Sequence, residues 1–264
     1  MKKTIVLLLL MLPLFGFSQS NKYNYKFTYK VVAKPDLDDE NLQIVENMAL
    51  YVGKEKSLYI SDVKLKIDSA RAAIKKRKGS PYEVSEFRQT LPKNRIVYSF
   101  EKNYKKSEII FTMMVFPSYE LYYTEPVSKF KWQIQTEEKQ ILGYTCQKAT
   151  LHYKGRNYVA WFGNSIPLQD GPWKFGGLPG LIFEIADTQN HYSFKIIALK
   201  KATKPFPQTN TNLIKTTKSG FASAVENIIK SFEDLLIGDF KIRFKRQRQE
   251  DKKNSKPNPI ELEK

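Results

Sequence analysis

Cys146 is the residue best suited by its type to nucleophilic chemistry, since a thiolate is a strong nucleophile and a soft metal ligand. It is the only cysteine in the sequence. His152 shares its parity along a strand, but the intervening extended chain separates the two by about 20 Å, so they cannot act as a pair. A single Cys in an apolar strand usually packs as a small hydrophobic side chain. We therefore expect a buried thiol, with a reactive one as the alternative.

Glu184 is the carboxylate best placed for acid–base chemistry. It lies in the apolar segment 181–186, on the same face as Ile182. Burial there would raise the pKa of its carboxyl and suit it to proton transfer. A position at the rim of the sheet, or a partner such as Arg156 or Lys174, explains the residue equally well. Catalysis is thus the alternative interpretation of Glu184.

Common enzyme signatures are missing from the sequence. Gly171 and Gly176 have the spacing of a phosphate loop, but Gly177 stands where that loop requires Lys. No G-x-S-x-G nucleophile motif occurs. Two histidines and one cysteine are too few for a typical zinc site. The sequence therefore predicts no metal and no cofactor, and it favours a binding protein over an enzyme.

The most unusual composition lies between residues 161 and 182, which hold five glycines and three prolines among large apolar side chains. Glycine permits positive φ and close backbone approach, proline fixes φ, and the apolar side chains require burial. We expect a packed, irregular loop that covers one side of a sheet. The residues predicted to have a structural or ligand-shaping role are Trp161, Pro172, Trp173, Phe175, Gly177, Leu178, Pro179, Gly180, Leu181 and Ile182.

Strands must position most of these residues. Apolar and polar side chains alternate from Tyr23 to Val31, and further alternating segments follow as far as residue 199. They predict a mainly β fold with two helices, in which about ten strands form a large antiparallel sheet or a partial β-barrel. One helix is expected from Asp62 to Lys78. The second, from Phe221 to Leu236, has an apolar stripe that should pack on the sheet.

The N-terminus predicts export. Residues 1–18 have the basic start, apolar run and small residues near a cleavage point that characterise a secretory signal peptide. We expect one β-rich domain over 19–240 and a basic C-terminal tail over 241–264. The residue directly after the cleavage point is not a cysteine, so the protein should be periplasmic or envelope-associated without being a lipoprotein.

The chain is strongly basic, with a formal net charge of +17. For an exported protein this favours anionic lipid or glycolipid as a partner and makes nucleic acid a poor candidate. The basic residues are also explained by solubility and by helix C-terminal charge. The candidates for binding an anionic surface are Lys75, Lys76, Arg77, Lys78, Lys241, Arg243, Lys245, Arg246 and Arg248.

The segment Gly177–Ile182 resembles the motif that names the GLPGLI family, exported proteins of Bacteroidetes-type bacteria. Trp132, the segment 141–149, Gly155-Arg156 and the terminal 258–262 resemble other landmarks of that family. The resemblance implies an accessory role in the cell envelope, near outer-membrane TonB-dependent transporters, and no agreed activity.

The function predicted from these features is that of an exported binding protein. Aromatic residues make up 13% of the chain, and with the Gly/Pro-rich loop they favour a protein that holds an apolar ligand or peptide, or that docks on such a transporter. Two alternatives remain. One is a basic surface module that binds anionic lipid or glycolipid, and the other is a hydrolytic enzyme that uses Glu184 or Cys146.

Overall fold

Alternating side chains produce strands along most of the chain. The computed structural model describes residues 21–37, 39, 42–115, 119–209, 213–253 and 259–261, so the predicted signal peptide lies outside the described residues. The strands are β1 (Lys22–Ala33), β2 (Ile44–Gly53), β3 (Lys56–Ser61), β4 (Tyr98–Asn103), β5 (Glu108–Val115), β6 (Tyr119–Pro126), β7 (Gln133–Ile141), β8 (Tyr144–Tyr153), β9 (Arg156–Gly163), β10 (Leu181–Asp187), β11 (Tyr192–Pro205) and β12 (Leu213–Lys215).

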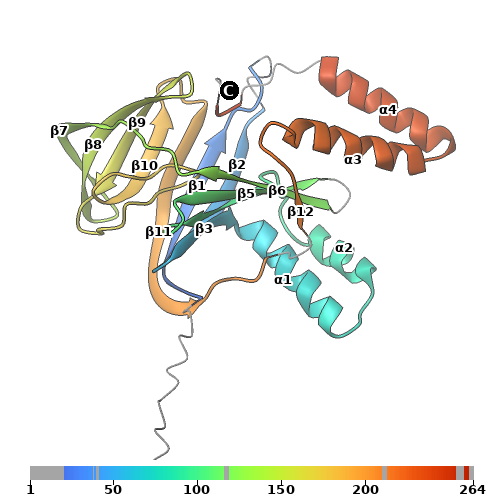
Figure 1. Cartoon of the computed structure of the whole chain (residues 1–264), viewed down its shortest axis with the longest axis horizontal. Helices are drawn as coiled ribbons and strands as arrows, with labels where there is room; N and C mark the ends of the chain where they lie inside the picture. The colour runs from blue at the N-terminus through green and yellow to red at the C-terminus, as the bar shows by residue number, and fades with distance from the viewer. Residues whose placement is uncertain are drawn as a thin grey trace, which may run out of the picture.

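These strands form a single curved sheet within the described residues (Figure 1). Their order is β12-β6-β5-β4-β3-β2-β1-β11-β10-β9-β8-β7. Every pairing is antiparallel except that of β12 with β6. Register shifts in β1, β7 and β10 mark irregularities of the β-bulge type, which bend a strand and increase its twist.

The prediction of a mainly β protein with a large antiparallel sheet is confirmed, and the partial barrel is corrected to an open sheet. β7 and β12 stand at its two edges and do not pair with each other. The long central strands β1 and β11 join the two halves of the sheet. Side chains from the loop between β9 and β10 fill the space that the curvature creates, so closure into a barrel is not needed to bury the core.

The prediction of two helices is wrong, because the described residues contain four: α1 (Asp62–Lys76), α2 (Pro81–Gln89), α3 (Phe221–Leu235) and α4 (Gly238–Lys253). Gly79 and Pro81, which follow α1, are residue types typical of a helix end. Instead, Ser80 caps a new helix, with Glu83 completing the capping box and Pro81 in the first turn, where proline is favoured. The second missed helix, α4, includes part of the predicted basic tail.

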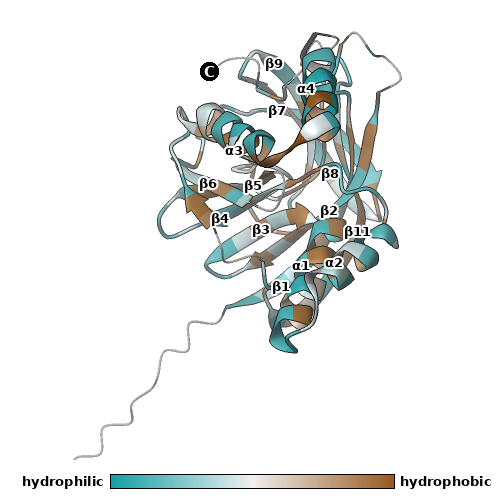
Figure 2. Ribbon diagram, turned by 90° about the vertical axis from the view of Figure 1, so that its right-hand side faces the viewer, coloured by the Kyte–Doolittle hydropathy of each residue, from teal (hydrophilic) through white to brown (hydrophobic). Residues whose placement is uncertain are grey.

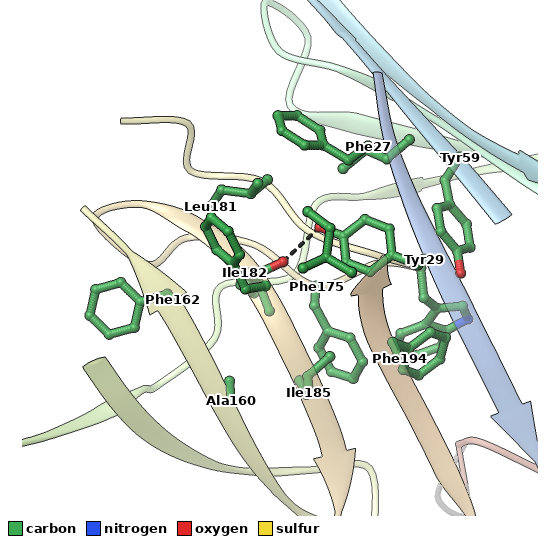
Figure 3. Close-up of a cluster of buried hydrophobic side chains, with 14 of the residues drawn as sticks. Phe27, Tyr29, Tyr59, Ala160, Phe162, Phe175, Leu181, Ile182, Ile185 and Phe194 are labelled. Atoms are coloured by element: carbon green, nitrogen blue, oxygen red, sulfur yellow. Dashed lines mark hydrogen bonds between the residues drawn. The ribbon is translucent and has the colours of Figure 1, made fainter. Parts of the chain in front are cut away.

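Two faces of the sheet are covered by different elements (Figure 2). A small cluster of Ala49, Tyr51, Leu58, Ile60, Leu65 and Phe206 lies where α1 packs on β2 and β3. The main core lies on the other face and includes side chains of the Gly/Pro-rich loop (Figure 3). There the Tyr29 hydroxyl donates to the Ile182 carbonyl over 2.6 Å, which ties the central strand β1 to β10.

Helix α3 contacts strands β5 and β6 of the sheet through its first residue, Phe221. The Phe221 ring lies 5.3 Å from Phe111 and 5.6 Å from Tyr123, between ring centroids. None of the α3 residues is buried. Further along, Phe232 packs against Phe244 of α4, with ring centroids 5.6 Å apart. The apolar stripe of α3 is therefore shared between the sheet and a second helix.

Candidate functional site

The Gly/Pro-rich loop, residues 164–180, folds back against the strands that it connects. Its backbone is hydrogen-bonded internally and to β10, since Gly177 donates to Gln169 and Ile182 donates to Asp170. Backbone groups that leave water need such partners, and here the loop itself supplies them. The loop therefore has a defined shape over the core.

The aromatic residues of this loop fill the core. Trp173 is 2% exposed and Phe175 is fully buried. The Trp173 ring lies 4.9 Å from Phe175 and 6.0 Å from Phe100, between centroids. Trp173 also has a φ of +53°, a strained conformation for a bulky residue that only surrounding packing can maintain. Of the remaining predicted residues, Leu178, Leu181 and Ile182 are buried, whereas Trp161 lies elsewhere, on the β9 surface that Lys139 covers.

A buried ion pair fixes the loop to strand β4. Lys102 Nζ lies 2.5 Å from Asp170 Oδ1 and also donates to the carbonyls of Gly171 and Phe175, over 3.2 and 2.6 Å. Asp170 accepts two further hydrogen bonds, from the Gly171 amide and the Tyr104 hydroxyl, each over 2.7 Å. Lys102 and Asp170 are 5% and 3% exposed. Such a pair is tolerated in the interior because its remaining donors and acceptors are satisfied.

Sequence reasoning missed Lys102 and Tyr104 as parts of this site. One signal was present: Lys102 follows Phe100 at a spacing of two, which places it on the same inward face of a strand. A lysine at such a position requires a buried partner. The partner lies 68 residues away along the chain, in the loop.

A pocket opens where this loop meets the turns after β2 and β4. It has a volume of about 480 Å³ and is lined by Val52, Gly53, Lys54, Tyr104, Ser107, Val127, Pro167, Leu168, Gln169 and Asp170. Burial, and then the neighbouring Asp170 carboxylate, raise the pKa of the Tyr104 hydroxyl far above its ordinary value. The hydroxyl therefore stays protonated and points inward, while Tyr104 as a whole remains 39% exposed. The pocket combines apolar walls, an accessible aromatic ring and fixed polar groups.

The structure brings together the two candidates for catalysis, Cys146 and Glu184, beside Lys139. Lys139 Nζ lies 2.9 Å from Glu184 Oε2 and 4.4 Å from the centre of the Trp161 ring. Burial is the main cause that raises the pKa of the Cys146 thiol to about 11, and nearby Glu184 raises it further while Lys139 opposes this. His152 bonds to Asn157 instead. The cluster thus offers a protonated thiol in place of an activated nucleophile, beside a carboxylate that is ion-paired with Lys139.

The Cys146 thiol should be nearly inert in the folded protein. With a pKa of about 11, the thiol has a roughly hundredfold smaller thiolate fraction at about pH 8 than an ordinary cysteine has. Full burial of the side chain slows attack further. Alkylation by iodoacetamide, followed by mass spectrometry, should therefore be fast only in the denatured chain. Because no other cysteine competes, equal rates in the folded and denatured states would contradict a buried, protonated thiol.

The basic residues predicted to bind an anionic surface lie on separate elements. Lys75 to Lys78 are at the end of α1, where Arg77 pairs with Glu83. On α4, Lys245 Nζ lies 3.2 Å from Glu233, and Arg248 pairs with Glu226 and Glu233, each over 2.8 Å. Acidic residues of α3 thus balance part of the α4 charge. Binding of anionic lipid or glycolipid by these residues stays a prediction.

The described residues form neither a metal-binding cluster nor a helix suited to crossing a membrane. Within the described ranges, His, Cys, Asp and Glu do not gather in any group of three or more that could hold a metal ion. Nor does any helix there combine the length and apolarity that crossing a membrane requires.

Comparison with known proteins decides the family. The model of the "N-glycanase peptide, N-terminal domain" family matches residues 58–219, from β3 to beyond β12. The chain belongs to this N-glycanase N-terminal domain family. Two solved structures of PNGF-II, in P21 and C2 space groups, resemble this N-glycanase-type domain with TM-scores of 0.53 and 0.51 and 16% sequence identity each. They cover 77% of the chain and 33% and 32% of their own length.

The N-glycanase-type domain thus spans about a third of the solved structures that it resembles. At this level of identity the likeness concerns the fold. No curated protein matches the chain.

The GLPGLI assignment is wrong, because the family match points to the N-glycanase N-terminal domain instead. The structure gives local reasons for the two glycines of the motif that do not depend on family membership. Gly177 has a φ of +82°, and a Cβ on Gly180 would lie 2.3 Å from the Gly163 carbonyl oxygen. Both glycines meet local backbone demands of the loop before β10. A short motif of this kind reports a tight turn and close packing, and it does not by itself specify a family.

Proposed function

We propose that this chain is a glycan-recognition domain of the N-glycanase type, which binds an N-glycan without cleaving it. An N-glycanase, by its name, acts on N-glycans, and the family match concerns the N-terminal domain of such a protein. This supports a glycan-related role in place of the envelope accessory role expected from the sequence. The proposal retains the idea of a binding protein whose Gly/Pro-rich loop shapes the site.

The observation that carries the proposal is the Tyr104–Asp170–Lys102 arrangement at the edge of the pocket. A sugar ring has apolar C–H faces and a rim of hydroxyl groups. Tyr104 presents an aromatic ring, while Gln169 and Ser107 line the pocket with an amide and a hydroxyl. Because Asp170 fixes the Tyr104 hydroxyl over 2.7 Å, the ring is held in place before a ligand arrives, which reduces the entropy lost on binding.

The charges in this pocket favour recognition over hydrolysis of a bond between two sugars. Hydrolysis of such a bond commonly requires two carboxyl groups, one on either side of it. Among the residues that line the pocket, Asp170 is the single carboxylate, and it is already bonded to Lys102, Tyr104 and the Gly171 amide. It therefore supports the shape of the site.

The Tyr104→Ala variant should bind the chitobiose core of an N-glycan at least tenfold more weakly than the wild type, a loss of about 1.4 kcal/mol. The reason is the loss of the only aromatic ring that lines the pocket. Isothermal titration calorimetry or ligand-observed NMR on the full chain measures this affinity. Tyr104→Phe keeps the ring but loses the bond to Asp170, so its affinity should lie between those of the wild type and Tyr104→Ala.

Tyr119→Ala is the matched control, because Tyr119 is 48% exposed on β6 and lies outside the pocket. An equal loss in both alanine variants, or no binding by the wild type, would refute the assignment of the pocket. A parallel incubation with an N-glycosylated protein tests the absence of cleavage, and release of its glycans by the wild type would overturn that part of the proposal.

A further inference from the structure

Residues 259–261 contact strand β9, although about a hundred residues separate the two along the chain. Arg156 Nη2 donates to the carbonyl of Pro259 over 2.8 Å, and the Tyr158 hydroxyl donates to the carbonyl of Ile260 over 3.1 Å. The Ile260 side chain packs against the main core. Two adjacent main-chain carbonyls and one apolar side chain are therefore bound at the same place.

The carboxylate of Glu261 completes these contacts. Lys174 Nζ lies 2.6 Å from Glu261 Oε1 and 2.6 Å from Glu125 Oε1. Lys218 Nζ lies 2.6 Å from Glu125 Oε2 and 3.6 Å from Glu261 Oε2. The two lysines and two glutamates form one closed network, to which Lys174 contributes from the Gly/Pro-rich loop.

The charge balance of this network demands an acidic ligand. Without Glu261, two lysines would face one carboxylate, and Lys174 is only 4% exposed, so water could not replace the missing partner easily. Burial acts to raise the pKa of Glu125, but Lys174 and Lys218 hold it below its ordinary value, which keeps that carboxylate charged. A second carboxylate at the position of Glu261 makes the site neutral, whereas an amide there would leave an excess positive charge.

These contacts have the features by which protein grooves recognise extended peptides. Main-chain hydrogen bonds supply affinity, and pockets for alternate side chains supply specificity. Here Arg156 and Tyr158 bind the main chain, and the lysines select the acidic side chain. Arg156 is itself fixed by Asp187, with Nη1 and Oδ2 3.4 Å apart. Apart from Lys218, whose side chain is 44% exposed, the site is therefore built from largely buried, mutually supported groups of the sheet and the loop.

We propose that the residues that bind 259–261 form a peptide-recognition site for an extended segment in which an apolar residue precedes a glutamate. Residues 259–261 are its intramolecular occupant, and a segment of the same chemistry from a partner protein displaces them. Residues 259–261 therefore compete with the partner segment for the same site. Because a tethered ligand has a high effective concentration, they set the partner concentration that displacement requires. This site is separate from the glycan pocket and does not depend on the function proposed there.

The test uses the full chain and a fluorescent synthetic peptide of residues 256–264 as the probe. In a tail-release variant, Ile260→Ser with Glu261→Ser, the competing segment loses its side-chain contacts while the residues that bind it are left unsubstituted. Fluorescence anisotropy should show that this variant binds the peptide at least tenfold more tightly than the wild type does. A peptide carrying Glu261→Gln should bind the variant at least tenfold more weakly than the native peptide.

Lys218→Met in the tail-release background should weaken peptide binding, because Lys218 is in the network yet its side chain is 44% exposed, so its loss is tolerated in folding. Lys241→Met is the matched control. Lys241 lies on α4, where its Nζ is 3.7 Å from Asp234 Oδ1, and its substitution should leave peptide binding unchanged. Equal binding of the Glu and Gln peptides, or no binding by the tail-release variant, would overturn the proposal.

A second measurement tests displacement of residues 259–261 in the wild type, without any substitution. A fluorophore at the C-terminus of the wild type should lose anisotropy when excess unlabelled native peptide is added, because the displaced segment tumbles more freely. The Gln peptide should have no such effect. Unchanged anisotropy with the native peptide would mean that residues 259–261 are a fixed part of the fold, which contradicts exchange.

Discussion

The Lys102→Met variant should lose about 3–5 kcal/mol of its free energy of unfolding, which is the usual cost of removing one partner from a buried ion pair. The reason is that Asp170 would remain 3% exposed without a countercharge. The carbonyls of Gly171 and Phe175 would lose a donor as well. Urea denaturation followed by circular dichroism measures the change.

Lys105→Met is the control for this experiment. Lys105 lies just beyond the same strand and also pairs with a carboxylate, Glu55, but its side chain is 69% exposed. Exposed pairs of this kind contribute about 0–1 kcal/mol.

A double variant, Lys102→Met with Asp170→Asn, leaves no unpaired charge. Its loss of unfolding free energy should therefore be smaller than the sum of the losses in the two single variants. Similar, small losses in Lys102→Met and Lys105→Met would show that the ion pair does not anchor the loop.

Gly180→Ala should be the most damaging of the small substitutions in the Gly/Pro-rich loop, at about 3 kcal/mol or more. A Cβ at this position would lie 2.3 Å from the carbonyl oxygen and 2.7 Å from the carbonyl carbon of Gly163. Both are backbone atoms of β9, so the clash is relieved only if the loop moves away from the strand. Thermal or urea unfolding of the variant measures the loss.

Gly177→Ala separates the effect of packing from the effect of backbone conformation. A Cβ on Gly177 meets nothing within 4 Å, but the residue has a φ of +82°. An L-residue in the left-handed region costs about 1–2 kcal/mol, so a smaller loss is expected here. If both variants lost the same stability, the close approach of Gly180 to β9 would not be what holds the loop in place.

Local periodicity predicted much of the fold. The alternation from Tyr23 to Val31 identified β1, and the apolar spacing from residue 221 identified α3. Both patterns depend on neighbouring residues along the chain, and this is why they are visible in a sequence. Helix α4 was missed because Phe240, Ile242 and Phe244 alternate with basic residues as in a strand. Contacts with α3, including Phe232 and Glu233, favour a helix there instead.

The sequence by itself determined that a packed Gly/Pro-rich loop lies within residues 161–182, because glycine, proline and large apolar residues have strong local requirements. Only the tertiary structure decided what the loop contacts. Lys102 meets Asp170 across 68 residues, and Arg156 meets Pro259 across 103. Pairings at such separations depend on how the sheet curves and where the loop lands on it, and no short-range pattern of residue types records that geometry.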